Sequence, residues 1–191
     1  MQTATTGPAP LTTTCGQTTL RLIQGDLTAL PVDAFVFYAR EDLRLGSGFG
    51  TAIQSRGGDA VRKELEQIGR LRVGEAALTT AGAMKVGFII HACGPKFQEP
   101  DMEAKLRQTM QAVLRLADAK GLKRIAFPPM GAGFYGVPLD LCARVMLETL
   151  REHLLGETEL EEVTICVLDR REYLAFAERL RNLWEERHAC H

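Results

Sequence analysis

From Thr18 onwards the sequence alternates between short apolar or β-branched runs and longer segments with helical periodicity. Several of the short runs are almost continuously apolar, as is typical of strands that are covered on both faces. This alternation predicts an α/β domain in which helices cover both faces of a central sheet, giving three layers. The expected strands are 18–24, 34–38, 75–81, 87–92, 124–127 and 162–168, and the expected helices are 48–56, 59–68, 102–120, 139–153 and 171–187.

The length and composition are those of one globular domain. The chain has 191 residues, of which 46% are hydrophobic and 25% are charged, enough to bury a sizeable core. We expect a single domain over residues 18–187, a flexible arm over 1–17, which is rich in Thr, Pro and Ala, and a frayed end over 188–191. The first residues lack the basic start and apolar core of a signal peptide, and no later apolar run is long enough to predict a membrane span.

Charge and cysteine content narrow the classes of partner. The 23 Lys and Arg residues nearly cancel the 24 Asp and Glu residues, so no broad basic surface for nucleic acid or membrane is expected. The five cysteines are odd in number and scattered, and the four histidines lack metal-ligand spacing. We therefore expect a cytoplasmic protein without a disulfide framework, a metal or a cofactor.

A glycine-rich segment over residues 128–138 connects an expected strand to an expected helix. Gly131, Gly133 and Gly136 can adopt positive φ and let backbone N–H groups approach an anion, while the helix start adds partial positive charge. The segment has neither the Lys-Ser/Thr ending of a P-loop nor the glycine spacing of a dinucleotide-binding turn. It predicts a phosphate-binding loop of another design, with a purely architectural tight turn as the alternative.

Further motifs occur in a fixed order along the chain: Gly25-Asp26-Leu27-Thr28, Asp33-Ala34-Phe35-Val36, Leu45-Gly46-Ser47-Gly48-Phe49-Gly50-Thr51-Ala52-Ile53, Ile89-Ile90-His91-Ala92-Cys93-Gly94-Pro95 and Ile125-Ala126-Phe127-Pro128. Together with the glycine-rich segment, these motifs resemble the macrodomain family over about residues 18 to 185. The resemblance implies a mixed sheet of about six strands between two helical layers. It also implies that ADP-ribose, free or attached to a macromolecule, binds in a cleft along one edge of the sheet.

The resemblance also assigns roles to individual residues. Asp26 would accept a hydrogen bond from the adenine amine, although an Asp at this position is also a good helix N-cap. Two loops, Gly46 to Gly50 and Gly131 to Gly136, would hold the diphosphate with backbone N–H groups, so that a nearly neutral protein could bind a dianion. The implied ligand-binding residues are Asp26, Leu27, Gly46, Ser47, Gly48, Phe49, Pro129, Gly131, Ala132, Gly133, Phe134, Tyr135 and Leu168, with Arg40 as a further candidate.

Some of these roles have purely structural alternatives. Phe49 and Phe134 would line the ligand channel and Tyr135 would pack beside the distal ribose, but each ring could instead support its loop. His91 and Cys93 lie at the end of an apolar strand without an evident third partner, so we interpret them as structural residues.

The sequence departs from the family pattern where hydrolytic members carry polar groups. Their Asn-Ala-Ala-Asn run is matched here by residues 37–40, which places Arg40 at the distal-ribose Asn, and an acidic position in the first loop is matched by Gly50. Losing these groups should reduce turnover more than binding. Arg40 could reach a phosphate or a terminal ribose group, or remain a solvated surface residue. Leu168 replaces an aromatic ring, so base stacking worth about 1–3 kcal/mol would be reduced.

The resemblance therefore predicts a noncatalytic or weakly catalytic reader of ADP-ribose. One alternative is an ADP-ribosyl hydrolase that acts on a modified protein, a nucleic acid or an acetyl ester. In that case the enzyme would be a mono-ADP-ribosyl hydrolase or an O-acetyl-ADP-ribose deacetylase. A third interpretation is a scaffold that has lost nucleotide binding. Nucleic acid is expected only as an ADP-ribosylated target.

Overall fold

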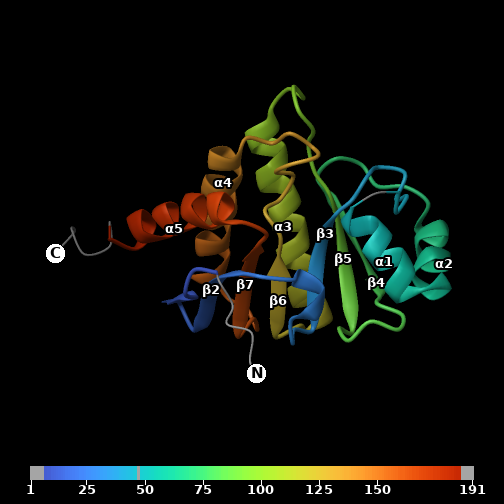
Figure 1. Ribbon diagram of the computed structural model, residues 1–191, viewed down its shortest axis with the longest axis horizontal. Helices are drawn as coiled ribbons and strands as arrows, with labels where there is room; N and C mark the ends of the chain where they lie inside the picture. Colours follow the sequence, from blue (N-terminus) through green and yellow to red (C-terminus); the bar gives the residue numbers. More distant parts are fainter. Residues whose placement is uncertain (1–6, 47, 186–191) are drawn as a thin grey trace.

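The computed structural model describes residues 7–46 and 48–185, which form a seven-stranded sheet between two helical layers (Figure 1). The strands are β1 (Leu11–Cys15), β2 (Thr18–Gln24), β3 (Ala34–Tyr38), β4 (Glu75–Thr80), β5 (Phe88–Cys93), β6 (Arg124–Phe127) and β7 (Glu162–Val167). The helices are α1 (Phe49–Gly57), α2 (Asp59–Ile68), α3 (Met102–Lys120), α4 (Leu139–Leu154) and α5 (Arg170–Glu185), with a short 3-10 turn, η1, over Leu27–Ala29. The predicted three-layer α/β/α fold is confirmed.

The strand order is β1-β2-β7-β6-β3-β5-β4. The five central strands run parallel, and β1 and β4 pair antiparallel at the two edges, so the sheet is mixed. All five parallel strands therefore end at the same edge of the sheet. The loops that follow them gather there, which is where open α/β sheets bind their ligands.

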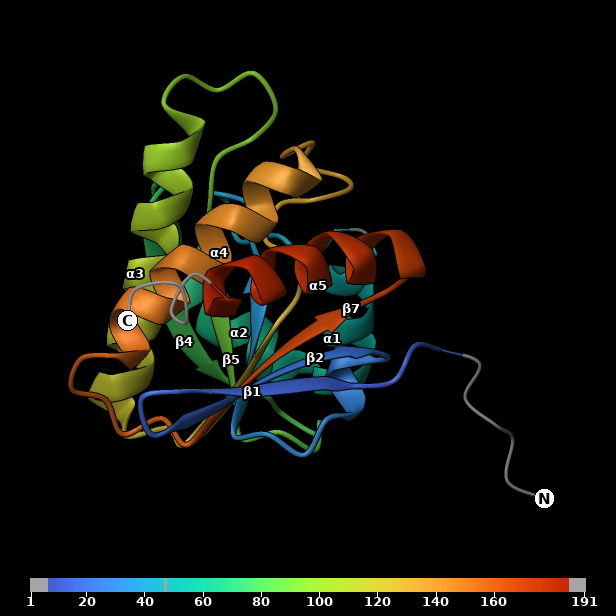
Figure 2. The same cartoon turned by 90° about the vertical axis from the view of Figure 1, so that its left-hand side faces the viewer.

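The first strand corrects the expected flexible arm over residues 1–17. Leu11–Cys15 pairs with β2 in a hairpin, from Leu11 opposite Leu22 to Cys15 opposite Thr18, and lies at the sheet edge in Figure 2. Gly16 supplies the positive φ of 61° that the two-residue turn requires. The threonines of this segment are β-branched and favour a strand, which outweighs the loop-like composition of its surroundings.

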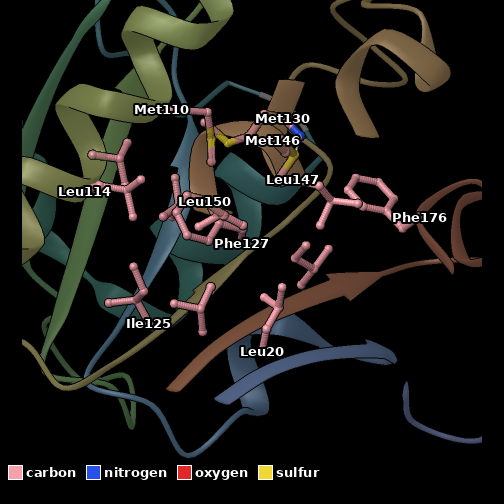
Figure 3. Packing of buried hydrophobic residues seen from close by; sticks show 14 of the residues in the cluster. Leu20, Met110, Leu114, Ile125, Phe127, Met130, Met146, Leu147, Leu150 and Phe176 are labelled. Carbon is pink, nitrogen blue, oxygen red and sulfur yellow. Dashed lines mark hydrogen bonds between the residues drawn. The ribbon is translucent and has the colours of Figure 1, made fainter. Parts of the chain in front are cut away.

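Each face of the sheet buries its own hydrophobic cluster. On one face, α3, α4 and α5 pack on the sheet around fully buried side chains that include Met110, Phe127 and Phe176 (Figure 3). On the other face, α1 and α2 cover a smaller cluster that includes Phe35 and Ile53. Burial on both faces explains why the central strands are almost continuously apolar.

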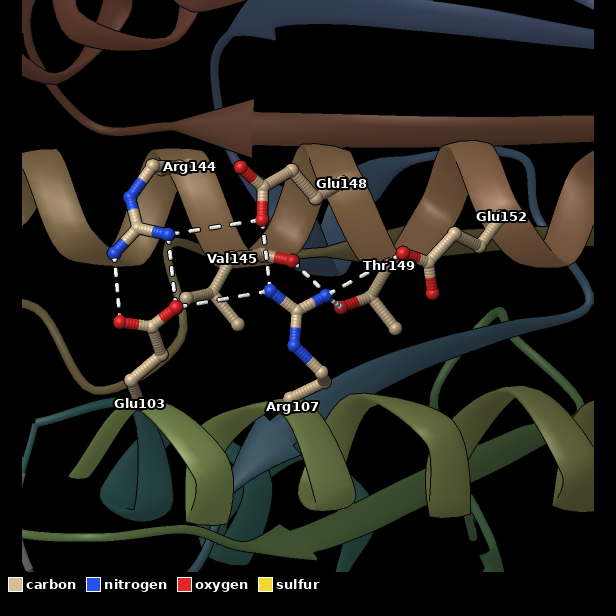
Figure 4. A network of polar contacts seen from close by, with 7 residues as sticks. All are labelled: Glu103, Arg107, Arg144, Val145, Glu148, Thr149 and Glu152. Atoms are coloured by element: carbon tan, nitrogen blue, oxygen red, sulfur yellow. Dashed lines mark hydrogen bonds and ion pairs between the residues drawn. The ribbon is translucent and has the colours of Figure 1, made fainter. Parts of the chain in front are cut away.

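An ion-pair network joins α3 to α4 at the surface (Figure 4). Both terminal nitrogens of Arg144 lie 2.8 Å from the Glu103 carboxylate, and Arg107 Nη2 lies 2.7 Å from Glu148 Oε2. These groups are partly exposed, so each pair contributes little stability, but the bidentate geometry fixes how the helices lie. The network thereby helps to fix the helix that begins directly after the glycine-rich segment. No helix within the described ranges is both long and apolar enough to cross a membrane.

Candidate functional site

A cleft of about 420 Å³ lies at the edge of the sheet where the parallel strands end. Its walls come from the loops after β2, β3, β6 and β7 and from the starts of α1 and α5. The lining is mostly apolar, with one carboxylate, which suits a ligand that presents a flat apolar part. The lining residues are Gly25, Leu27, Phe37, Tyr38, Gly48, Phe49, Pro128, Pro129, Gly131, Ala132, Gly133, Phe134, Tyr135, Cys166, Leu168 and Glu172.

The second glycine-rich loop, Gly131 to Gly136, forms one wall of the cleft. Gly131, Gly133 and Gly136 all have positive φ, at 75°, 86° and 74°. Two backbone hydrogen bonds close the loop, from Gly136 N–H to Gly133 O and from Val137 N–H to Gly131 O, both at 3.0 Å. The N–H groups of residues 131, 133, 134 and 135 have no hydrogen-bond partner among the described residues. They are therefore available to an anion in the cleft.

The remaining N–H groups of this loop turn inward. Met130 N–H donates to Met146 Sδ at 3.3 Å, and the N–H groups of Met130 and Ala132 point at the Cys142 thiol. Cys142 and Met146 are fully buried on α4, and burial raises the pKa of the Cys142 thiol well above its usual range. The loop is thus fixed on α4 by contacts between backbone N–H groups and sulfur atoms.

The first glycine-rich loop, Gly46 to Gly50, leads into α1 on the opposite wall. Gly48 is the N-cap of α1 and lines the cleft with Phe49. The N–H groups of Phe49 and Gly50, in the first helical turn, have no partner among the described residues, as expected at a helix N-terminus. Ser47 lies outside the described residues. Gly46 lines a separate hollow in this structure, so its predicted contact with ligand stays a prediction.

An aromatic wall stands where hydrolytic relatives were expected to carry polar groups. The rings of Phe37 and Phe49 stack with centroids 6.3 Å apart and planes 19° apart. A Cβ on Gly50 would lie 3.1 Å from Leu45 Cα and 3.4 Å from Phe37 Cζ. A side chain at position 50 would therefore press on the Leu45 backbone and touch the Phe37 ring.

Asp26 makes the capping contact that the sequence left open as an alternative. Its Oδ1 accepts hydrogen bonds from the N–H and the hydroxyl of Thr28, at 2.9 and 2.5 Å, and Arg56 Nη1 lies 3.6 Å from Oδ2. The Thr28 hydroxyl is the main cause of a lowered pKa for this carboxyl. The neighbours Gly25 and Leu27 line the cleft, whereas the half-exposed Asp26 side chain does not. A contact between Asp26 and adenine remains a prediction.

The same end of the cleft contains two residues that sequence reasoning missed, Cys166 and Glu172. Glu172 is only 7% exposed, and its Oε2 accepts a hydrogen bond from Leu168 N–H at 2.8 Å. Burial first, and then the carboxylates of Asp26 and Glu172, raise the pKa of the Cys166 thiol to about 12. The spacing of Asp169 and Glu172 is that of a capping box, a signal that could have placed the Glu172 side chain here. Leu168 also lines the cleft, and its contact with a base stays a prediction.

The other end of the cleft is built from tyrosines. The Tyr38 hydroxyl donates to Pro95 O at 2.5 Å, and the Tyr38 ring centroid lies 4.9 Å from that of Tyr135. Burial raises the pKa of both phenols, for Tyr38 far above its usual range. Both hydroxyls are therefore uncharged at neutral pH.

Arg40 lies on the far side of this tyrosine wall. Its Nη2 is 3.0 Å from Asp42 Oδ2, and its side chain is half-exposed. It lines a smaller hollow of about 300 Å³ with Lys96 and Phe97, and this hollow shares Phe134 and Tyr135 with the cleft. The structure thus places Arg40 next to the cleft and outside its lining.

His91 and Cys93 do not line the cleft. His91 is fully buried, with Nε2 2.9 Å from Thr79 Oγ1, and burial raises the pKa of Cys93 to about 11. Their contacts are those of structural residues. Across residues 7–46 and 48–185, no group of three or more His, Cys, Asp or Glu side chains is arranged to hold a metal ion.

The mixed sheet, the two helical layers and the glycine-lined cleft at the strand ends define a three-layer α/β/α protein. The Macro domain family model matches residues 38–146, and the chain belongs to the macrodomain family. A macro domain-containing protein of Cupriavidus necator is 34% identical over 167 residues, covering 84% of this chain and 96% of the relative. The predicted family resemblance is thereby confirmed.

Other relatives indicate what similar proteins bind. A Pantoea vagans protein named O-acetyl-ADP-ribose deacetylase 1 is 31% identical over 160 residues, covering 81% of this chain and 94% of the relative. The Oceanobacillus iheyensis macrodomain solved with ADP superposes with a TM-score of 0.88 at 28% identity, covering 93% of this chain and 98% of that one. The Trypanosoma brucei macrodomain in complex with ADP-ribose superposes with a TM-score of 0.78 at 28% identity, covering 84% of this chain and 68% of that one.

Proposed function

We propose that this protein binds ADP-ribose, or a closely related ADP-ribosyl ligand, as a noncatalytic or weakly catalytic reader. The observation that carries the proposal is the set of unpartnered backbone N–H groups on Gly131, Gly133, Phe134 and Tyr135, counted over the described residues. The loop that carries them lines the same cleft as the N-terminus of α1, so neutral donors from two sides would replace the water around a diphosphate. The relatives solved with ADP and with ADP-ribose support the same ligand class.

The shape of the cleft suggests how the ligand lies. The base would rest against Leu27 and Leu168, the diphosphate would lie between the two loops, and the distal ribose would pack beside Tyr135. Asp26 Oδ2 is the oxygen of that carboxylate left for the adenine amine, because Oδ1 is occupied by Thr28. Without an aromatic ring at Leu168, stacking on the base is weaker than in relatives that have one.

Binding is favoured over turnover because the ribose end of the cleft lacks a general base among its described lining residues. The groups there are the Phe37 and Phe49 rings and the uncharged hydroxyls of Tyr38 and Tyr135. Within that described lining, Glu172 supplies the only carboxylate, and it lies at the base end. A general base must come within hydrogen-bond reach of the attacking water, directly or through one water, and a carboxylate at the base end is badly placed for that.

A hydrolase that removes ADP-ribose from a protein, a nucleic acid or an acetyl ester is the second candidate. The name of the Pantoea vagans relative favours it. In this case Arg40 would help to orient the substrate from the neighbouring hollow. In either case we place the protein in the cytoplasm, and we expect nucleic acid only as an ADP-ribosylated target, because the net charge of −1 provides no broad basic surface.

Calorimetry with free ADP-ribose tests the proposal, with Gly133→Glu as the variant. A Cβ on Gly133 meets no atom within 4 Å, so the new carboxylate would lie beside the phosphates and repel them. Gly58→Glu is the matched control, because Gly58 also has positive φ and open space but lies at the start of α2, outside the cleft.

We expect heat and thermal stabilisation for the wild type and for Gly58→Glu, and neither for Gly133→Glu. No heat from the folded wild type at millimolar ligand would overturn the proposal. Release of ADP-ribose from a modified protein, abolished by Gly133→Glu and retained by Gly58→Glu, would establish the hydrolase instead.

A further inference from the structure

The smaller hollow of about 300 Å³ adjoins the cleft at its tyrosine end. Its lining residues are Arg40, Lys96, Phe97, Phe134 and Tyr135. Phe134 and Tyr135 also line the cleft, so the two spaces meet at this pair of residues. In the proposed pose the distal ribose packs beside Tyr135. A group attached to that ribose would therefore leave the cleft over Phe134 and Tyr135 and enter the hollow.

Two aromatic side chains of this lining are strongly exposed, Phe97 at 65% and Phe134 at 84%. Phe97 belongs to the segment between β5 and α3, which projects beyond the strand ends in Figure 1. This segment packs on the second glycine-rich loop. Phe97 N–H donates to Tyr135 O at 2.8 Å, and a Cβ on Gly136 would lie 2.7 Å from Phe97 Cβ. Both rings therefore border the hollow from loops that are fixed to one another, and their exposed surface can cover a flat group.

The hollow also carries an excess of positive charge. Arg40 and Lys96 line it, and both side chains are half-exposed. The two carboxylates beside them lie outside the lining, and each is shared between two cations at N–O distances of 3.0 to 3.9 Å: Asp42 with Arg40 and Arg44, and Glu41 with Lys96 and Arg70. The next carboxylate, Glu99, pairs with Lys105 at 3.6 Å. Positive charge therefore remains available to an anion in the hollow.

Every residue of the described lining is either a cation or an aromatic residue. Guanidinium and ammonium groups bind phosphate, and nucleic-acid bases stack on aromatic rings. A peptide would also need partners for its backbone N–H and C=O groups, and the lining has no amide or carboxylate side chain to provide them. Resting on the proposed function, we propose that the ADP-ribosyl group is carried on the end of a single-stranded nucleic acid, whose terminal nucleotide lies in this hollow.

The linkage places each part of that nucleotide next to a suitable side chain. When ADP-ribose is attached to a terminal phosphate, that phosphate is bonded directly to the distal ribose. It leaves the cleft first and lies near Arg40 and Lys96, and the base of the same nucleotide lies against Phe97 or Phe134. The net charge of −1 provides no broad basic surface for the rest of the strand, so one nucleotide supplies the gain in affinity.

Calorimetry tests the proposal with free ADP-ribose, a short single-stranded oligonucleotide that carries ADP-ribose on its terminal phosphate, and an acidic peptide that carries ADP-ribose. We expect the wild type to bind the modified oligonucleotide at least about fivefold more tightly than free ADP-ribose, the lower limit for one stacked base. The modified peptide should gain less. Phe97→Ala and Arg40→Gln should each reduce the gain for the oligonucleotide by about threefold or more.

The controls make the same chemical changes on exposed positions outside both the cleft and the hollow. Leu155→Ala removes an exposed apolar side chain, and Arg115→Gln removes an exposed guanidinium from α3. Both should keep the wild-type gain. The gain is a ratio of two affinities measured on one variant, so a change that affects only the ADP-ribosyl part of the ligand cancels.

A smaller gain for the oligonucleotide in the wild type would overturn this proposal and leave the proposed function intact. An equal or larger gain for the peptide would also overturn it, and would indicate a protein as the modified partner. A gain that survives in both Phe97→Ala and Arg40→Gln would show that the strand binds outside the hollow. If the wild type binds none of the three ligands, the proposed function fails and this proposal fails with it.

Discussion

Gly131 is the position at which the cleft depends most directly on glycine. Its φ is 75°, and a Cβ built there would lie 2.6 Å from Val137 Cγ2 and 2.9 Å from the Tyr38 ring and hydroxyl. Tyr38 has little freedom to move away, because it is buried and its hydroxyl bonds to Pro95 O. Gly131→Ala should therefore distort the second glycine-rich loop as well as strain its own backbone.

The expected loss of stability has two parts. Placing alanine at a left-handed φ costs about 1–2 kcal/mol. Forcing a methyl group into a packed site adds about 1–3 kcal/mol. Gly133 has a φ of 86°, but a methyl group there would meet no atom within 4 Å. Gly133→Ala therefore incurs only the cost of the left-handed backbone. Alanine lowers the entropy of the unfolded chain equally in both variants, so their difference of about 1–3 kcal/mol isolates the contact with Tyr38 and Val137.

Urea unfolding followed by circular dichroism measures this difference. We expect both midpoints to fall, and that of Gly131→Ala to fall further, with m-values equal to that of the wild type. Equal losses of stability in the two variants would refute the reasoning, because they would show that Tyr38 and Val137 accommodate the added methyl group without loss of stability. A change in m would instead indicate that the unfolded state, or the two-state behaviour, had changed.

Two further predictions concern buried polar groups. Burial lowers the pKa of His91 from 6.5 to about 4, so the unfolded chain binds more protons between these values. The contribution of neutral His91 to the free energy of unfolding is complete above pH 6.5 and falls by up to about 3 kcal/mol towards pH 4. His91→Gln should flatten the dependence of the urea midpoint on pH between 4 and 6.5. An unchanged slope in this variant would contradict the buried neutral state. Tyr38→Phe leaves the buried Pro95 carbonyl without its donor and should cost about 1–3 kcal/mol in the same titration, whereas no loss would show that the carbonyl finds another donor.

The fold could be predicted from local patterns because its central strands are apolar on both faces and its helices end at clear signals. Gly121, for example, follows α3 in a left-handed conformation, as its sequence position indicated. The edge strand Leu11–Cys15 was missed because it buries few apolar side chains. Only one of its five residues is fully buried, so a pattern of apolar burial is weak there, and its pairing depends on the neighbouring strand.

The site could be predicted where a role depends on backbone freedom, and not where it depends on tertiary contacts. Glycine permits the positive φ of Gly131 and Gly133, and both residues line the cleft, while their contact with a ligand stays a prediction. The inward N–H groups of Met130 and Ala132 depend on sulfur atoms from α4, which local sequence does not place. Glu172 was overlooked because its side chain reaches the cleft by folding back over the end of β7.

The two departures from the hydrolytic pattern at the first loop are physically linked. Phe37 stands in the run where relatives carry a polar motif, and its ring packs within 3.4 Å of where a side chain on Gly50 would begin. The same ring stacks on Phe49, which opens α1. A side chain at position 50 would therefore press on the Leu45 backbone and contact an aromatic ring, so packing at the first loop disfavours an acidic residue there. The Phe37 and Phe49 rings form an apolar wall of the cleft, and Glu172 is the only carboxylate in its described lining, an arrangement that supports the proposed binding role over hydrolysis.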